Sequence, residues 1–190
     1  MSAAQPGPDG VLRCPWALSA PDYLGYHDEE WGTPLHGDDA LFERLVLEAF
    51  QSGLSWLIIL RKRPAFRTAF HGFAMAEVAE FDESDIERLL ADAGIVRNRS
   101  KIEAAIANAR VALTLPGGLA DHLWSFAPES PRPAPVTLAD IPAVTVESTA
   151  LAKDLKKRGI KFVGPTTAYA LMQATGMVDD HLVDCVARRG

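Results

Sequence analysis

The feature that most constrains the fold of this 190-residue chain is its hydrophobic periodicity, which is helical in most segments. Apolar residues recur three and four positions apart, and several of these segments end at glycine, as capped helices do. The strict alternation that predicts half-buried strands is rare. The sequence therefore predicts an all-α fold. The expected helical segments are 38–52, 55–63 with a further turn opened by Pro64, 82–94, 99–115, 148–159 and 165–176.

Two segments fall outside this helical pattern. Residues 1–10 are predicted to form a disordered N-terminal tail, and residues 127–144, which contain five prolines, are predicted to form an irregular connector. The remaining length, residues 11–190, suits one domain that buries its core without disulfides, or alternatively two small lobes that share a boundary.

The composition argues against a membrane protein or a secreted one. No apolar run approaches the roughly 18 residues that a membrane span requires. The N-terminus lacks a basic stretch followed by an apolar core, so no signal peptide is expected. Two cysteines, Cys14 and Cys185, do not make a disulfide framework. We therefore expect a monomeric cytoplasmic protein in a reducing compartment, with no membrane partner.

The distribution of charge leaves nucleic acid open as a partner, although the net charge is −6. Twelve of the nineteen Lys and Arg residues lie in three clusters, at 61–67, 97–101 and 153–161. Local clusters rather than net charge set the affinity for phosphate. The same clusters also fit a set of solvated helix faces, so charge alone does not decide.

A tight turn, "IKFV", joins the last two expected helices between Gly159 and Gly164. Glycine lets a backbone approach a phosphate closely, and the first-turn amides of a helix face an anion. Pro165 has no N–H, so the donors would be the amides of Gly164, Thr166 and Thr167, together with both Thr hydroxyls. The turn is therefore a candidate phosphate-binding hairpin, although glycine-bounded turns are also common between helices of ordinary bundles.

Two Cys–His pairs lie at opposite ends of the chain: Cys14 with His27, and His181 with Cys185. Together they make a Cys2His2 set, which suits tetrahedral zinc. The spacing of four residues predicts that His181 and Cys185 share one helix face. The twelve residues between Cys14 and His27 fit no common zinc-finger spacing, so a buried cysteine and a surface histidine are the alternative.

Seven parts of the chain carry a family resemblance: "RCPW", "YHDEEWG", "LFERLVLEAFQSGLSW", "ILRKR", "DAGIVRNRSKIEAAIANAR", "LKKRGIKFVGPTTAYALMQATGMVDDH" and Cys185. With these segments in this order, the sequence resembles the bacterial DNA-3-methyladenine glycosylase I family, a branch of the helix-hairpin-helix DNA glycosylases. The resemblance extends from residue 12 to 186 and implies a helix-hairpin-helix bundle. It also implies a structural Zn²⁺ site in which Cys14, His27, His181 and Cys185 join the N- and C-terminal regions. Four protein ligands leave no open position for water, so this zinc would stabilise the fold and not catalyse.

The same resemblance implies a monofunctional DNA glycosylase that acts in the first step of base excision repair. It would flip 3-methyladenine out of alkylated double-stranded DNA and hydrolyse its N-glycosidic bond. No lysine stands where bifunctional relatives place a nucleophile, so water attacks and an abasic site remains. The alternatives are a non-catalytic alkylation-damage DNA-binding protein on the same scaffold and a zinc-stapled helical interaction module.

The resemblance assigns the base pocket to four residues. Glu48 would read the base, Tyr26 and Trp56 would stack on it, and Trp16 would line the pocket. An N3-alkylated purine is a cation with a weakened glycosidic bond, so aromatic faces and one carboxylate suit it. On a helical wheel Glu48 lies at the edge of the apolar face, where it is either a solvated rim residue or a pocket floor. The alternative for each aromatic residue is ordinary core packing.

The DNA contacts implied by the resemblance fall in the loop after residue 50 and in the hairpin. Leu54 would fill the gap that the flipped base leaves in the duplex. The residues concerned are Gln51, Ser52, Gly53 and Leu54 in the loop, and Lys161, Gly164, Thr166 and Thr167 in the hairpin.

Asp179 is a second candidate for the chemistry. Many helix-hairpin-helix glycosylases place a catalytic aspartate a short helix beyond the hairpin, although this family is described as lacking it. We hypothesise that Asp179, in "VDDH", stabilises the oxocarbenium-like transition state or orients water. The alternative is an N-cap of the last helix. Asp180 matches the acid that the family usually has before His181.

Overall fold

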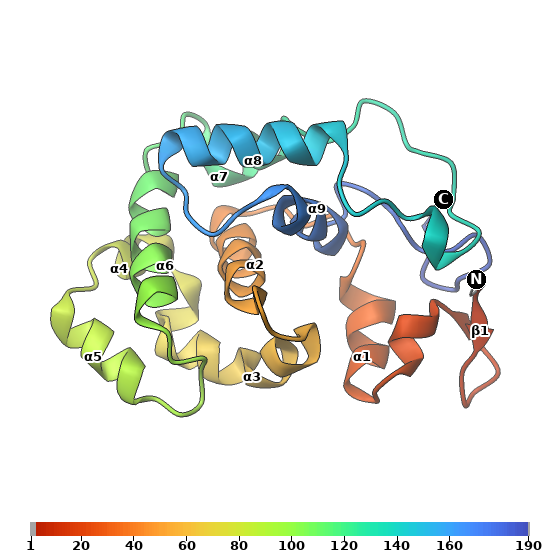
Figure 1. Ribbon diagram of the computed structural model, residues 1–190, viewed down its shortest axis with the longest axis horizontal. Helices are drawn as coiled ribbons and strands as arrows, with labels where there is room; N and C mark the ends of the chain where they lie inside the picture. Colours follow the sequence, from red (N-terminus) through yellow and green to blue (C-terminus); the bar gives the residue numbers. More distant parts are fainter. Residues whose placement is uncertain (1–2, 190) are drawn as a thin grey trace.

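The computed structural model describes residues 3–189 as a mostly helical protein built around α2 (Asp38–Gln51), as Figure 1 shows. Helices α3 (Trp56–Ala69), α6 (Arg99–Ala112) and α9 (Pro165–Ala174) pack against α2, and α8 (Val146–Arg158) packs on α9. The shorter helices are α1 (Asp22–Gly25), α4 (Met75–Ala79), α5 (Glu83–Ala91) and α7 (Gly118–Trp124). Single turns are formed by η1 (Pro15–Leu18), η2 (Tyr26–Glu30), η3 (His71–Phe73) and η4 (Leu138–Asp140).

The main core surrounds α2, in which every residue from Leu41 to Phe50 is buried. Aromatic rings of α2, α3 and η3 meet there; Phe50 lies 4.9 Å from Phe66, and Phe70 stacks on Phe73 at 5.5 Å. Because α2 is covered along this length, any polar side chain that it carries is removed from water. A second, smaller cluster lies apart from this core and contains Cys14, Leu182, Cys185 and Ala187.

The helices predicted from periodicity at 38–52, 99–115, 148–159 and 165–176 are confirmed as α2, α6, α8 and α9. Their ends follow local signals in the sequence. The side chain of Asn98 caps α6, and that of Thr145 caps α8. Gly159 ends α8 in the left-handed conformation, with φ of 99°, which costs glycine little.

Two helix boundaries differ from the prediction. Pro64 does not open a new turn, because α3 continues through it from Trp56 to Ala69. The segment 82–94 forms a shorter helix, α5, which ends at Ala91. Gly94 is therefore not its cap. A Cβ added at Gly94 would lie 2.9 Å from Ala65 Cβ, so tertiary packing against α3 explains the glycine.

The N-terminal segment is not a disordered tail where the structure describes it. Gln5–Pro6 (β1) pairs antiparallel with Leu12–Arg13 (β2). The guanidinium of Arg13 fixes this hairpin by ion pairs with Asp9 at 2.7 Å and Asp28 at 2.8 Å. The prediction of a disordered tail is therefore wrong for the residues of this hairpin, and its contact with Asp28 joins it to a segment that local sequence does not connect to it. The part of that prediction that falls on residues 1 and 2 lies outside the described residues.

The two ends of the described chain meet at one side of the molecule (Figure 1). The amide of Val186 donates to the carbonyl of Leu12 at 2.9 Å. The proline-rich connector at 127–144 is irregular apart from η4, as predicted. Across residues 3–189, none of the helices has the length and apolarity that crossing a bilayer takes.

Candidate functional site

A cavity of about 260 Å³ lies where α2, α3, α9 and the turns before α2 converge. Its walls are largely aromatic: the ring of Tyr26 lies 5.5 Å from that of Trp56 and 6.3 Å from that of Trp16. Glu48 supplies the only carboxylate among the described lining residues, and only 5% of its surface is exposed. The lining residues are Trp16, Ser19, Tyr23, Tyr26, Trp31, Glu48, Gln51, Trp56, Ala170 and Gln173.

Glu48 is held in an apolar environment. Burial raises the pKa of its carboxyl to about 8, although Arg44, one helical turn earlier, opposes this shift. Arg44 is itself occupied: its guanidinium pairs with Glu30, and its Cζ lies 5.7 Å from the centroid of the Tyr26 ring. A carboxylate in this setting gains more from a cationic ligand than one already paired with an arginine.

The structure brings Trp16, Tyr26, Glu48 and Trp56 into one cavity, as the resemblance implied; their roles in binding a base stay a prediction. Gln51 lines this cavity as well, although the sequence placed it with the DNA loop. Several lining residues escaped the sequence reasoning, namely Ser19, Tyr23, Trp31, Ala170 and Gln173. Trp31 lies within "YHDEEWG", but nothing local indicates that its ring turns toward the cavity.

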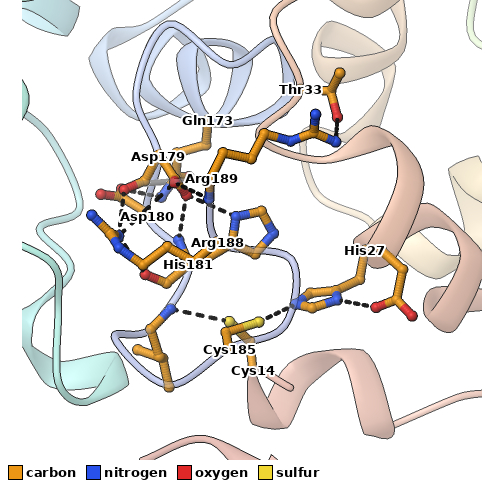
Figure 2. A network of polar contacts seen from close by, with 12 residues as sticks. Cys14, His27, Thr33, Gln173, Asp179, Asp180, His181, Cys185, Arg188 and Arg189 are labelled. Carbon is orange, nitrogen blue, oxygen red and sulfur yellow. Dashed lines mark hydrogen bonds and ion pairs between the residues drawn. The ribbon is translucent and has the colours of Figure 1, made fainter. Parts of the chain in front are cut away.

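A cluster of thiol and imidazole groups joins the two chain ends (Figure 2). The ligand atoms of Cys14, His27 and Cys185 all lie within 4.8 Å of one another, and Cys185 Sγ is 3.4 Å from His27 Nε2. All three residues are buried. A hydrogen bond between the two sulfurs raises the pKa of Cys14 and lowers that of Cys185 to about 4, which favours one thiolate.

His181 lies next to this cluster, outside the three-residue group. Its ring is 4.9 Å from that of His27 and nearly perpendicular to it, and its buried Nε2 has no hydrogen-bond partner among residues 3–189. The Nδ1 atoms of the two histidines contact carboxylates, Asp28 at 2.7 Å and Asp179 at 2.8 Å. Such contacts leave Nε2 free as a metal ligand, so the four side chains fit a zinc site.

The final segment does not place these residues as predicted. No helix forms between Val178 and Arg189, so His181 and Cys185 do not share a helix face. A turn connects them instead, in which the Cys185 amide donates to the Leu182 carbonyl at 2.9 Å.

Asp179 therefore caps no helix in the described chain, and it does not line the cavity that holds Glu48. Its carboxylate accepts hydrogen bonds from the backbone amides of His181 and Arg189, each at 3.1 Å. Burial opposes ionisation of Asp179, but these bonds and its contact with the His181 ring outweigh burial and lower its pKa to about 2. The adjacent Asp180 pairs with Arg132 at 2.6 Å and accepts from Gln173 at 2.8 Å, so it ties the connector to α9.

Most basic side chains of the first two clusters form contacts within the protein; the exception is Arg97, which is exposed. At 61–67, Arg61 pairs with Asp22 at 2.8 Å, while Arg63 and Arg67 pair with Glu43 at 2.5 and 3.0 Å. In the second cluster, at 97–101, Arg99 forms ion pairs with glutamates of α5 and α6, and Lys101 is buried.

Only the cluster at 153–161 presents several lysines to solvent. Lys153, Lys156, Lys157 and Lys161 are exposed, and none forms an ion pair within residues 3–189. These lysines surround the turn between α8 and α9, where a phosphate-binding surface was predicted.

The loop after α2 and the turn between α8 and α9 border one groove of about 700 Å³. Ser52 lines it from one side, and residues 159–164 together with Lys156 and Thr167 line it from the other. Leu54 is 37% exposed, at the end of a turn in which Gly53 adopts a φ of 81°. Thr166 is exposed in the first turn of α9. The predicted DNA-contacting residues thus lie on adjoining surfaces, and their contact with DNA stays a prediction.

Comparison with known proteins gives consistent results. The family model for methyladenine glycosylase matches residues 16–189. The chain is 47% identical to DNA-3-methyladenine glycosylase 1 of Escherichia coli over 182 residues, which is 94% of this chain and 97% of that protein. It is 43% identical to the DNA-3-methyladenine glycosylase of Haemophilus influenzae, across 92% and 97% of the two chains.

Solved structures agree with the sequence matches. A 3-methyladenine DNA glycosylase I from Staphylococcus aureus superposes with a TM-score of 0.89 at 38% identity, covering 94% of this chain and 97% of that one. A variant of a 3-methyladenine DNA glycosylase I in complex with 3-methyladenine has a TM-score of 0.88 at 37% identity, covering 94% and 98%.

Proposed function

The chain belongs to the methyladenine glycosylase family, and we propose that it hydrolyses the N-glycosidic bond of 3-methyladenine in alkylated DNA. The observation that carries this proposal is the buried carboxylate of Glu48 in a cavity walled by Trp16, Tyr26 and Trp56. The reaction is monofunctional hydrolysis and opens base excision repair. We take residues 11–190 as the domain that performs it, acting as a monomer in the cytoplasm.

The cavity suits a cationic purine flipped out of the duplex. The aromatic faces of Tyr26 and Trp56 attract the positive charge, and the Glu48 carboxylate accepts a hydrogen bond from the exocyclic amino group. The bond between C1′ and N9 breaks, and its electron pair stays on N9, so the cationic base leaves as a neutral molecule. Water adds hydroxide to C1′ and releases its proton to solvent. A good leaving group of this kind needs little help from a general acid.

The DNA contacts fall on the groove between the α2 loop and the α8–α9 turn. Leu54, exposed at the end of its turn, is suited to enter the base stack after flipping. The amides of Gly164, Thr166 and Thr167 lie at the start of α9, where helix amides lack intrahelical acceptors and bind phosphate. Lys161 and the neighbouring exposed lysines add positive charge.

We further propose that Cys14, His27, His181 and Cys185 bind a structural Zn²⁺. The unpartnered Nε2 of buried His181 and the carboxylates on both Nδ1 atoms support this site. When bound, the ion holds the two chain ends together and supplies no chemistry to the base cavity. Mass spectrometry of the native protein would detect one zinc per chain, and its absence from a His181→Ala variant would identify the ligand.

Chromatography of bases released from methylated duplex DNA tests the function. We expect wild-type protein to release 3-methyladenine and Glu48→Gln to lose most of this activity. Glu80→Gln, at an exposed glutamate beyond α4, is the matched control and retains activity. Folded, zinc-loaded protein that binds the DNA but releases no base would contradict the proposal and favour a damage-binding role.

A further inference from the structure

Helix α6 carries two buried polar side chains, Lys101 and Asn108, that are seven residues apart and therefore lie on one face. Only 9% of Lys101 and 1% of Asn108 is exposed. Burying such groups is costly unless they form hydrogen bonds. Each of them bonds to the backbone of a different segment, and both segments border the groove proposed to contact DNA.

Lys101 holds the end of α2. Its Nζ donates to the carbonyls of Phe50 at 2.9 Å and Ser52 at 2.6 Å. The Phe50 carbonyl is among the last of α2, and the Ser52 carbonyl belongs to the residue that caps it. Neither can accept a hydrogen bond from a following turn of this helix, because the helix ends at Gln51. The ammonium group thus fixes the point from which the loop of Ser52, Gly53 and Leu54 departs.

Asn108 holds the turn between α8 and α9. Its Nδ2 donates to the carbonyl of Lys161 at 3.1 Å, and its Oδ1 accepts from the Lys161 amide at 2.8 Å. The side-chain amide therefore binds both backbone groups of one turn residue. In Figure 1 this turn passes beside α6 on the side of α2.

We propose that Lys101 and Asn108 are positioning residues that make α6 a spacer between the α2 loop (51–54) and the α8–α9 turn (159–164). A helix is a rigid element, so two side chains fixed two turns apart on it set the distance between the segments they hold. The loop and the turn then contact the same stretch of DNA together. The inference rests on the proposed function, because it assigns a purpose to this spacing only if both segments bind DNA. Neither residue lines the cavity of Glu48.

Single-turnover excision and binding of the free base distinguish this role from a contribution to the pocket. In Lys101→Met and in Asn108→Leu, we expect excision from methylated duplex to fall ~10-fold or more, since small misplacements of a substrate are costly. The affinity for free 3-methyladenine, followed by Trp fluorescence, should stay within about twofold because the cavity is unchanged. Equal losses in excision and in base binding would overturn the proposal, as would unchanged excision.

The chain offers a matched control in Lys62, whose Nζ donates to the carbonyls of Ala93 at 2.9 Å and Gly94 at 3.0 Å. Lys62→Met removes the same kind of bond between α3 and the loop before α6, away from the groove. We expect it to excise at the wild-type rate. If Lys62→Met lost as much excision activity as Lys101→Met, a general loosening of the fold would explain both losses, and the proposal would be overturned. If Lys101→Met melts below the assay temperature, Lys101→Gln, which retains a donor, replaces it under the same criteria.

The double variant tests whether the two residues act through one spacing. If both residues act through one spacing, releasing either end already frees the segments. The double variant Lys101→Met with Asn108→Leu should then excise no more slowly than the slower of the two single variants. Losses that multiply would show independent roles and overturn the proposal. Wild-type protein that releases no 3-methyladenine would instead refute the proposed function, so the two failures are distinguishable.

Discussion

Glu48 and Asp179, the two carboxylates that the sequence offers for chemistry, lie in opposite environments. Glu48 is buried among aromatic rings, and desolvation raises its pKa to about 8. Asp179 is also partly buried, but hydrogen bonds from His181 and Arg189 lower its pKa to about 2. A cationic ligand would therefore stabilise the ionised form of Glu48, whereas hydrogen bonds from the surrounding segment already stabilise that of Asp179. Residue type thus says little about role until the partners are known.

Matched isosteric variants give the largest expected contrast. Glu48→Gln should lower single-turnover release of 3-methyladenine ~100-fold or more, the usual scale for removing a preorganised electrostatic group. Asp179→Asn in zinc-saturated protein should stay within about twofold of wild type, because its carboxylate does not line the cavity. A comparable loss in both variants would break the comparison and restore a catalytic role to Asp179.

Zinc affinity should reverse the order of the two variants. Asp179→Asn replaces the carboxylate that contacts His181 Nδ1 by a neutral amide. Loss of a carboxylate that orients a metal-binding histidine lowers metal affinity ~10–100-fold. Glu48→Gln should bind zinc as wild type does. Competition with a chromogenic chelator measures both. Unchanged affinity in Asp179→Asn would separate Asp179 from the proposed metal site.

The pH dependence of kcat/KM follows from the raised pKa of Glu48. The alkylated base is a fixed cation, so Glu48 serves it only when ionised. Below about pH 8, kcat/KM of the wild type should therefore rise about tenfold per pH unit and level above it. Asp179→Asn should keep this profile, and Glu48→Gln should lose it. A flat wild-type profile between pH 6 and 9 would mean that Glu48 is ionised throughout.

The smallest expected effect is on stability. Because the pKa of Glu48 is raised from 4.5 to about 8 on folding, the folded state binds its proton more tightly, and stability falls as pH rises through this window. Glu48→Gln removes that loss, so its melting temperature should gain a few degrees on the wild type between pH 5 and 8. Asp179→Asn should change the melting temperature by the same amount at pH 5 and at pH 8. Differential scanning fluorimetry measures these melting temperatures. If Glu48→Gln differed from the wild type by the same amount at every pH, the raised pKa of Glu48 would be contradicted.

Parts of the fold with strong local signals were predictable from sequence. Asn98 and Thr145 directly precede α6 and α8, and Gly159 directly follows α8. The predicted bounds of these helices, 99–115 and 148–159, differ from the observed ones by at most three residues. The pairing of Gln5 with Arg13 was missed. Arg13 of this hairpin also pairs with Asp28, and no local pattern in the sequence indicates that contact. The helix expected at His181 failed for a similar reason, since contacts with Cys14 and His27 shape that segment.

The sequence by itself determined the main helices, the turn between α8 and α9, and the presence of a Cys2His2 set, because periodicity, caps and residue chemistry are local properties. Only the tertiary structure decided that Glu48 lines a cavity while Asp179 supports His181. It also decided that the basic cluster at 61–67 is held in ion pairs while the lysines at 153–161 face solvent. The reason is physical: desolvation and ion pairing depend on groups brought together from distant parts of the chain, and they set which charges remain available for a ligand.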